Sequence, residues 1–67
     1  MTVDFHPTEL WNFTTPDGRR VRAILLPRGL EVTLAWLVND RIEGAEDFAE
    51  AEEAMRRAEE LRVSFER

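Results

Sequence analysis

The last third of the chain constrains the fold most. From Ala45 to Phe65, apolar side chains recur at helical spacing, and charged residues fill the positions between them. The acidic residues near its start favour a first helical turn between Ala45 and Asp47. Such a helix needs an apolar surface to lie on. The face that would contact this surface holds Phe48, Ala51, Ala54, Met55, Ala58, Leu61 and Phe65.

The first two thirds of the chain supply that surface as three apolar runs. Large apolar and polar residues alternate over residues 8–14, 19–26 and 30–38, a period typical of strands with one buried face. Turn signals separate the runs: Pro16-Asp17-Gly18 after the first and Pro27-Arg28-Gly29 after the second. We therefore predict a three-stranded antiparallel meander.

A fourth strand is an optional addition to this meander. Asn39-Asp40 can adopt the positive φ angles of a tight hairpin, which would allow a short strand over residues 41–43. Gly44 is then expected to break the chain before the helix begins.

The predicted fold is thus α+β, with one C-terminal helix packed on one face of the sheet. Residues 1–7 are expected to form an N-terminal arm, and residues 8–67 a single β-β-β-α domain. Trp36 is expected to be fully buried. The predicted core contains Trp11, Phe13, Val21, Leu25, Val32, Leu34, Trp36, Phe48, Met55 and Leu61.

Composition limits how such a chain can be stabilised. Its 67 residues allow one domain with a thin core. It has no cysteine and a single histidine, so neither a disulfide nor a histidine-rich metal site is available, and self-association is the remaining common source of stability. No apolar run approaches a membrane span, and the start does not resemble a signal peptide, so the expected compartment is the cytoplasm.

Charge is distributed unevenly. Residues 1–42 hold five acidic and five basic residues, whereas residues 43–67 hold nine acidic and four basic residues. The whole net charge of −5 therefore lies in the C-terminal part, most of it on the predicted helix. Every basic residue is an arginine, whose planar guanidinium suits bidentate contact with carboxylates or phosphates.

No group of residues has the spacing of a catalytic or metal site. His6 lies in the predicted arm, and Ser64 has no histidine near it in sequence. The helix carboxylates are best explained as a solvated face, and the three glycines are isolated at turns, so no phosphate-binding loop is present. We expect a chain that is not an enzyme and needs no cofactor or metal.

The sheet face that the single helix leaves uncovered is the candidate site. Its polar half could enter a major groove, as β-sheet readers of DNA do. This layout resembles the three-strand-plus-helix DNA-binding domains at the N-termini of some phage-type integrases, which implies contact with a duplex. The alternative is that Arg20 and Arg22 are solvated and pair with Glu31. The candidate DNA-contact residues are Asn12, Arg20, Arg22, Arg28 and Thr33.

The other half of this face is apolar and suggests contact with protein. Ile24, Leu26 and Leu37, with Ala35, would form a patch that a second copy of the chain or another protein could cover. In size and charge the chain resembles phage-borne inhibitors and antitoxin-like regulators. We therefore expect a small acidic, non-enzymatic protein-binding module, with DNA binding as the alternative. The candidate partner-binding residues are Arg20, Arg22, Ile24, Leu26 and Leu37.

Overall fold

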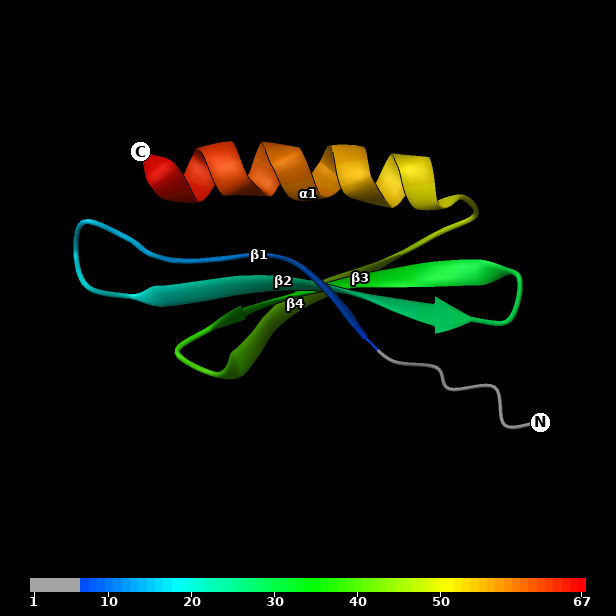
Figure 1. Cartoon of the computed structure of the whole chain (residues 1–67), viewed down its shortest axis with the longest axis horizontal. Helices are drawn as coiled ribbons and strands as arrows, with labels where there is room; N and C mark the ends of the chain where they lie inside the picture. Colours follow the sequence, from blue (N-terminus) through cyan, green and yellow to red (C-terminus); the bar gives the residue numbers. More distant parts are fainter. Residues whose placement is uncertain (1–6) are drawn as a thin grey trace.

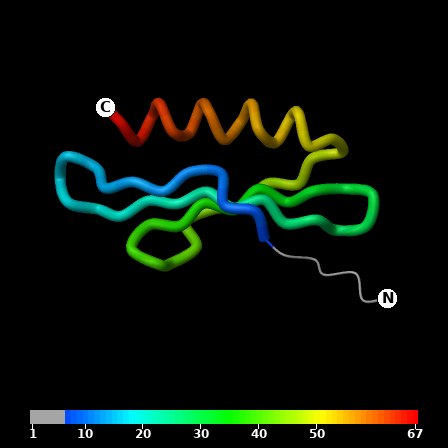
Figure 2. The backbone as a smooth tube through the Cα atoms, viewed as in Figure 1, coloured from blue at the N-terminus to red at the C-terminus, as the bar shows by residue number. Residues whose placement is uncertain are grey.

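The computed structural model describes residues 7–67, so all of the predicted arm except Pro7 lies outside the described residues. Four antiparallel strands follow one another in the sheet and precede one helix. The helix lies across one face of the sheet and runs opposite to the last strand (Figures 1 and 2). The α+β class and the C-terminal helix are confirmed. The elements are β1 (Thr8–Thr14), β2 (Arg20–Arg28), β3 (Glu31–Val38), β4 (Arg41–Phe48) and α1 (Ala51–Glu66).

The hairpin turns form where the sequence predicts them, except that the second turn lies slightly later in the chain. Asn39 and Asp40 have φ angles of 52° and 67°, the left-handed conformation that a tight hairpin requires. In the second turn, Pro27 and Arg28 belong to β2, and the chain turns at Gly29 and Leu30 instead. Leu30, predicted to begin the third strand, is 99% exposed.

The first turn is held by Thr15, which is buried. Its main-chain N–H donates to the carbonyl of Arg19 (2.7 Å), and its carbonyl accepts from the N–H of Gly18 (2.9 Å). Its hydroxyl donates to the carboxylate of Asp17. This hydrogen bond, followed in importance by contact with Arg19, lowers the pKa of Asp17 below its ordinary value of 3.8.

The stability of this turn is therefore expected to depend on pH. Because the folded-state pKa of Asp17 is lowered, its contribution is present above 3.8 and is lost as the pH falls through the folded-state value. Asp17→Ala should lower the melting temperature at neutral pH, and the difference from wild type should shrink in strong acid. Thermal unfolding at both pH values measures this, with Glu43→Ala as the control for removal of an exposed carboxylate. A difference that stays constant with pH would contradict it.

The fourth strand is longer than predicted. β4 pairs with β3 from Arg41 to Phe48, and Gly44 lies inside the strand rather than breaking it. A register shift between Trp36 and Leu37 leaves Glu43 without a cross-strand partner and places Gly44 opposite Trp36. The expected short strand over 41–43 is thus corrected to a full strand with a bulge.

The helix consequently begins later than predicted. Residues 45–48 pair with β3, and the hydroxyl of Thr33 donates to the carboxylate of Asp47 at 2.6 Å. Glu50 is the extended N-cap residue, with φ −132° and ψ 145°, and α1 starts at Ala51. Phe48 therefore packs against the core from the end of β4, not from the helix.

Alanines form the closest contact between helix and sheet. Ala54 and Ala58 are buried against Ala23 and Leu34, so the helix backbone lies near the sheet. Of the predicted core, Val21 and Leu34 are fully buried. Met55 is 54% exposed, which corrects its placement. The remaining predicted core residues are only partly buried, Trp36 among them: Trp11, Phe13, Leu25, Val32, Trp36, Phe48 and Leu61.

An ion pair connects the side of the helix that faces β4 to the sheet. The Nε of Arg57 donates to the carboxylate of Glu46 on β4 at 3.2 Å, and Nη1 lies 3.4 Å from Glu60. The hydrogen bond to Glu46 is the main reason that the pKa of Arg57 is raised. Because these side chains are substantially exposed, the pair contributes little to the free energy of folding. Its main effect is to orient α1 on the sheet.

Candidate protein-binding surface

The sheet face opposite α1 is not covered by any element among residues 7–67 (Figure 1). The strand register places the candidate residues of the strands by their alternation on this face. Three rows cross it: Asn12, Arg22, Leu37 and Ile42; then Glu9, Ile24, Ala35 and Ala45; then Leu26, Thr33 and Asp47.

An apolar band crosses this face diagonally from β2 to β4. We use this name for Ile24, Leu26, Ala35, Leu37, Ile42 and Ala45. Ile42 is 70% exposed, whereas Ile24, Leu26 and Leu37 are partly exposed. Ala35 is only 3% exposed; it is small and lies on a central strand, opposite Ile24 on β2 and Ala45 on β4. The exposed surface of the band therefore comes mainly from its isoleucine and leucine side chains.

Arg22 is held by two carboxylates beside the band. Its Nε donates to Glu9 on β1 at 3.1 Å, and Nη1 lies 3.7 Å from Asp40 in the turn between β3 and β4. The predicted alternative of pairing with Glu31 is corrected, because the register places Glu31 opposite Arg28. The positive charge of Arg22 is thus compensated locally.

The other candidate arginines lie at opposite ends of β2. Arg20 is exposed and follows the first turn, opposite Thr14. Arg28 is exposed at the far end of the strand, six positions beyond Arg22. Six residues of strand span about 20 Å, so Arg28 does not join the pair formed by Arg20 and Arg22.

The two polar candidates differ in what they offer a partner. Asn12 is exposed beside Arg22. Thr33 is only 7% exposed, and its hydroxyl is bound to Asp47. Thr33 therefore contributes mainly to the pairing of β3 with β4.

Four members of this surface were not predicted from the sequence: Ile42 and Ala45 in the band, and Glu9 and Asp40 beside Arg22. Ile42 and Ala45 belong to the part of β4 that had been expected as a short strand and a chain break. The Asn39-Asp40 turn signalled that Ile42 would lie opposite Leu37, whereas the pairing of Ala45 with Ala35 depends on the bulge. Glu9 gave no signal, because its contact with Arg22 spans two strands.

No helix in the described part of the chain is long and apolar enough to cross a membrane. Comparison with protein-family models, with curated proteins and with solved structures found no match.

Proposed function

We propose that this chain is a small acidic, non-enzymatic binding module that contacts another protein through the apolar band, as a regulator or inhibitor acting in the cytoplasm. The observation that carries the proposal is the band itself, a continuous group of aliphatic side chains on the face that α1 leaves open. Covering such surface is favourable by about 25 cal/mol per Å² of apolar area.

The size of the face indicates what kind of contact it suits. Four strands of seven to nine residues span a projected area of about 500 Å². A standard protein interface buries about 800 Å² on each partner. Because protruding side chains make the accessible area larger than the projected area, the face is about the size of one standard interface.

Charge around the band favours protein over DNA. An apolar centre with a polar, charge-compensated rim is typical of protein interfaces. DNA affinity depends largely on neutralising phosphates, but the chain carries a net charge of −5 and Arg22 is already paired with two acids. DNA binding is the alternative function, and the experiment described next distinguishes the two.

The test compares wild type with Ile42→Asp, which places a charge in the band at its most exposed position. Folding stability should change by no more than about 0.5 kcal/mol, because the site is on the surface. Val63→Asp is the matched control, since Val63 is an exposed valine (41%) on the helix. Self-association, read by sedimentation equilibrium as a mass near twice 7.8 kDa, should be lost only in the Ile42 variant.

If wild type is monomeric, capture from a cell lysate with the same three baits identifies the partner. A protein retained by wild type and Val63→Asp but lost with Ile42→Asp supports the proposal. Equal behaviour of all three baits would refute it. Amide shifts at Arg20, Arg22 and Arg28 that appear with a DNA duplex at low salt and vanish at high salt would establish the alternative.

A further inference from the structure

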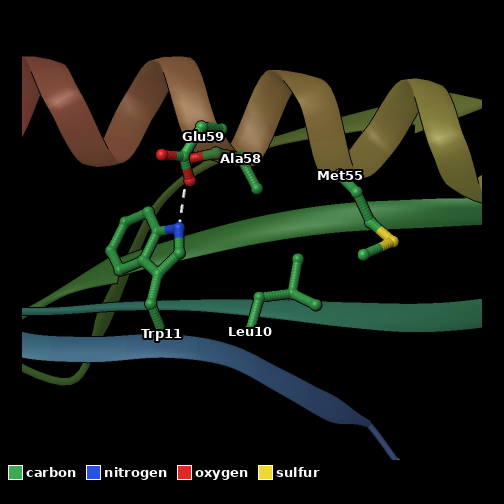
Figure 3. A pocket seen from close by; sticks show the side chains of 5 residues that line it. All are labelled: Leu10, Trp11, Met55, Ala58 and Glu59. Atoms are coloured by element: carbon green, nitrogen blue, oxygen red, sulfur yellow. Dashed lines mark hydrogen bonds between the residues drawn. The ribbon is translucent and has the colours of Figure 1, made fainter.

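A second surface lies on the other side of the molecule, between β1 and α1. A pocket of about 140 Å³ opens there, lined by residues of both elements (Figure 3). We call it the β1–α1 groove. Its lining residues are Leu10, Trp11, Met55, Ala58 and Glu59.

The groove is lined by apolar side chains together with polar groups, among them Glu59, and its wall is fixed. The indole Nε1 of Trp11 donates to the carbonyl of Ala58 at 3.0 Å, so the one polar atom of the ring is satisfied (Figure 3). The ring also contacts Phe13 and Phe65, with centroids 5.4 and 6.2 Å away. A cavity of about 150 Å³ can hold a benzene molecule, so this volume has room for one leucine- or phenylalanine-sized side chain.

The strand beside the groove is an edge strand with free main-chain groups. β1 pairs only with β2 in the described sheet. Both main-chain groups of Arg20 bond to Asn39 on the β3 side, the N–H to Oδ1 (3.1 Å) and the carbonyl to N–H (2.8 Å). Its cross-strand neighbour Thr14 therefore directs its N–H and carbonyl away from the sheet, and by alternation Asn12 does the same.

The helix flank above the groove is acidic. Glu52, Glu59 and Glu66 are seven residues apart, close to two helical turns, so they share one flank, and Glu59 places that flank over β1. Arg62 pairs with Glu59 and Glu66, and Arg56 follows Glu52 by about one helical turn, so these five residues carry a formal charge of −1 and Glu52 is the carboxylate farthest from Arg62. The hydrogen bond from Arg62 lowers the pKa of Glu59, so Glu59 is ionised at neutral pH. We call Glu52, Glu59 and Glu66 the acidic flank.

We propose that the β1–α1 groove binds an extended, basic segment of a partner protein as a fifth strand, with one apolar side chain in the pocket. Main-chain hydrogen bonds to Asn12 and Thr14 would align the segment, as in other cases where a peptide extends a sheet edge. The pocket selects the apolar side chain. Charge complementarity to the acidic flank selects a basic neighbour.

The spacing of this basic neighbour follows from geometry. Glu52 precedes the middle of the pocket-lining stretch Met55–Glu59 by about five residues, which is about 7.5 Å along the helix. Two residues of an extended chain cover about 6.8 Å and place their side chains on the same side. The segment should therefore carry arginine or lysine two positions from the apolar residue.

A short acetylated peptide with a central leucine and an arginine two positions away is the probe. Titrated into the ¹⁵N-labelled protein, it should cause saturable shifts at the Trp11 indole N–H and at the amides of Asn12 and Thr14. Replacing the leucine by alanine should weaken binding by about tenfold. Replacing the arginine by glutamate should weaken it by about fivefold.

Matched protein variants locate the site. Met55→Gln and Glu52→Gln should weaken binding of the probe, whereas Val63→Gln and Glu53→Gln should not. Ile42→Asp should leave it unchanged, so this proposal and the proposed function can fail separately. The inference would be overturned by the absence of saturable shifts, by equal binding of the arginine and glutamate peptides, or by shifts centred on the apolar band.

Discussion

Gly44→Ala is expected to destabilise the fold by about 1 to 3 kcal/mol, although it adds only one methyl group. A Cβ at Gly44 would lie 2.6 Å from Cε2 and 3.0 Å from Cη2 of Trp36, with Cζ2 nearer still. The indole would have to leave its place against the core. In an uncrowded strand the same substitution stabilises, because it restricts the unfolded chain, so the sign of the effect is diagnostic.

A second substitution tests the cause. Trp36→Leu removes the ring atoms that the new methyl group meets, so Gly44→Ala should cost much less in that background. Urea unfolding of wild type, both single variants and the double variant gives the coupling free energy. Additive effects would show that the cost of Gly44→Ala does not arise from its contact with Trp36.

Leu34→Ala is expected to have the largest effect of any single truncation, about 3 to 5 kcal/mol. Among residues 7–67, Leu34 is the largest fully buried side chain, in the centre of β3 beneath Ala54 and Ala58. A 67-residue domain is stabilised by about 3 to 10 kcal/mol in total. The variant should therefore be largely unfolded at room temperature.

Leu37→Ala, three positions along the same strand, is the matched control. Leu37 lies on the uncovered face and is partly exposed, so its truncation should cost clearly less. Circular dichroism during thermal unfolding measures both variants. Similar losses in the two would mean that the two sheet faces contribute equally to the core.

Much of the fold follows from local patterns. The alternation over β2 and β3 correctly assigns Val21, Ala23 and Leu34 to the helix side and Arg22 and Leu37 to the other side. Period-two alternation leaves a strand only two faces, so one buried residue fixes its neighbours.

The boundary between β4 and α1 could not be predicted in the same way. Residues 45–48 have helical composition, but pairing with β3 and the Thr33–Asp47 hydrogen bond hold them extended. Tertiary hydrogen bonds outweigh a local propensity of a few tenths of a kcal/mol per residue. Met55 lies at the edge of the contact between helix and sheet, because the small side chains of Ala54 and Ala58 let the helix approach the sheet most closely on their side.

The candidate site likewise contains some residues that local patterns predict and others that depend on tertiary contacts. Ile24, Leu26 and Leu37 could be placed on one face from alternation alone. Ile42 and Ala45, which extend the apolar band, and Glu9 and Asp40, which compensate Arg22, depend on contacts between strands. The β1–α1 groove had no signal, because it forms only where the last element returns to the first strand.

The sequence by itself determined the features that depend on neighbouring residues: the Asp17-Gly18 and Asn39-Asp40 turns, the two faces of β2 and β3, and a C-terminal amphipathic helix. Each is set by φ preferences or side-chain periodicity within a few residues. The tertiary structure alone decided the bulge at Glu43, the packing of Trp36 on Gly44 and the start of α1 at Ala51. These depend on which atoms meet when distant segments pack, and side-chain volume and hydrogen bonding then override local preference.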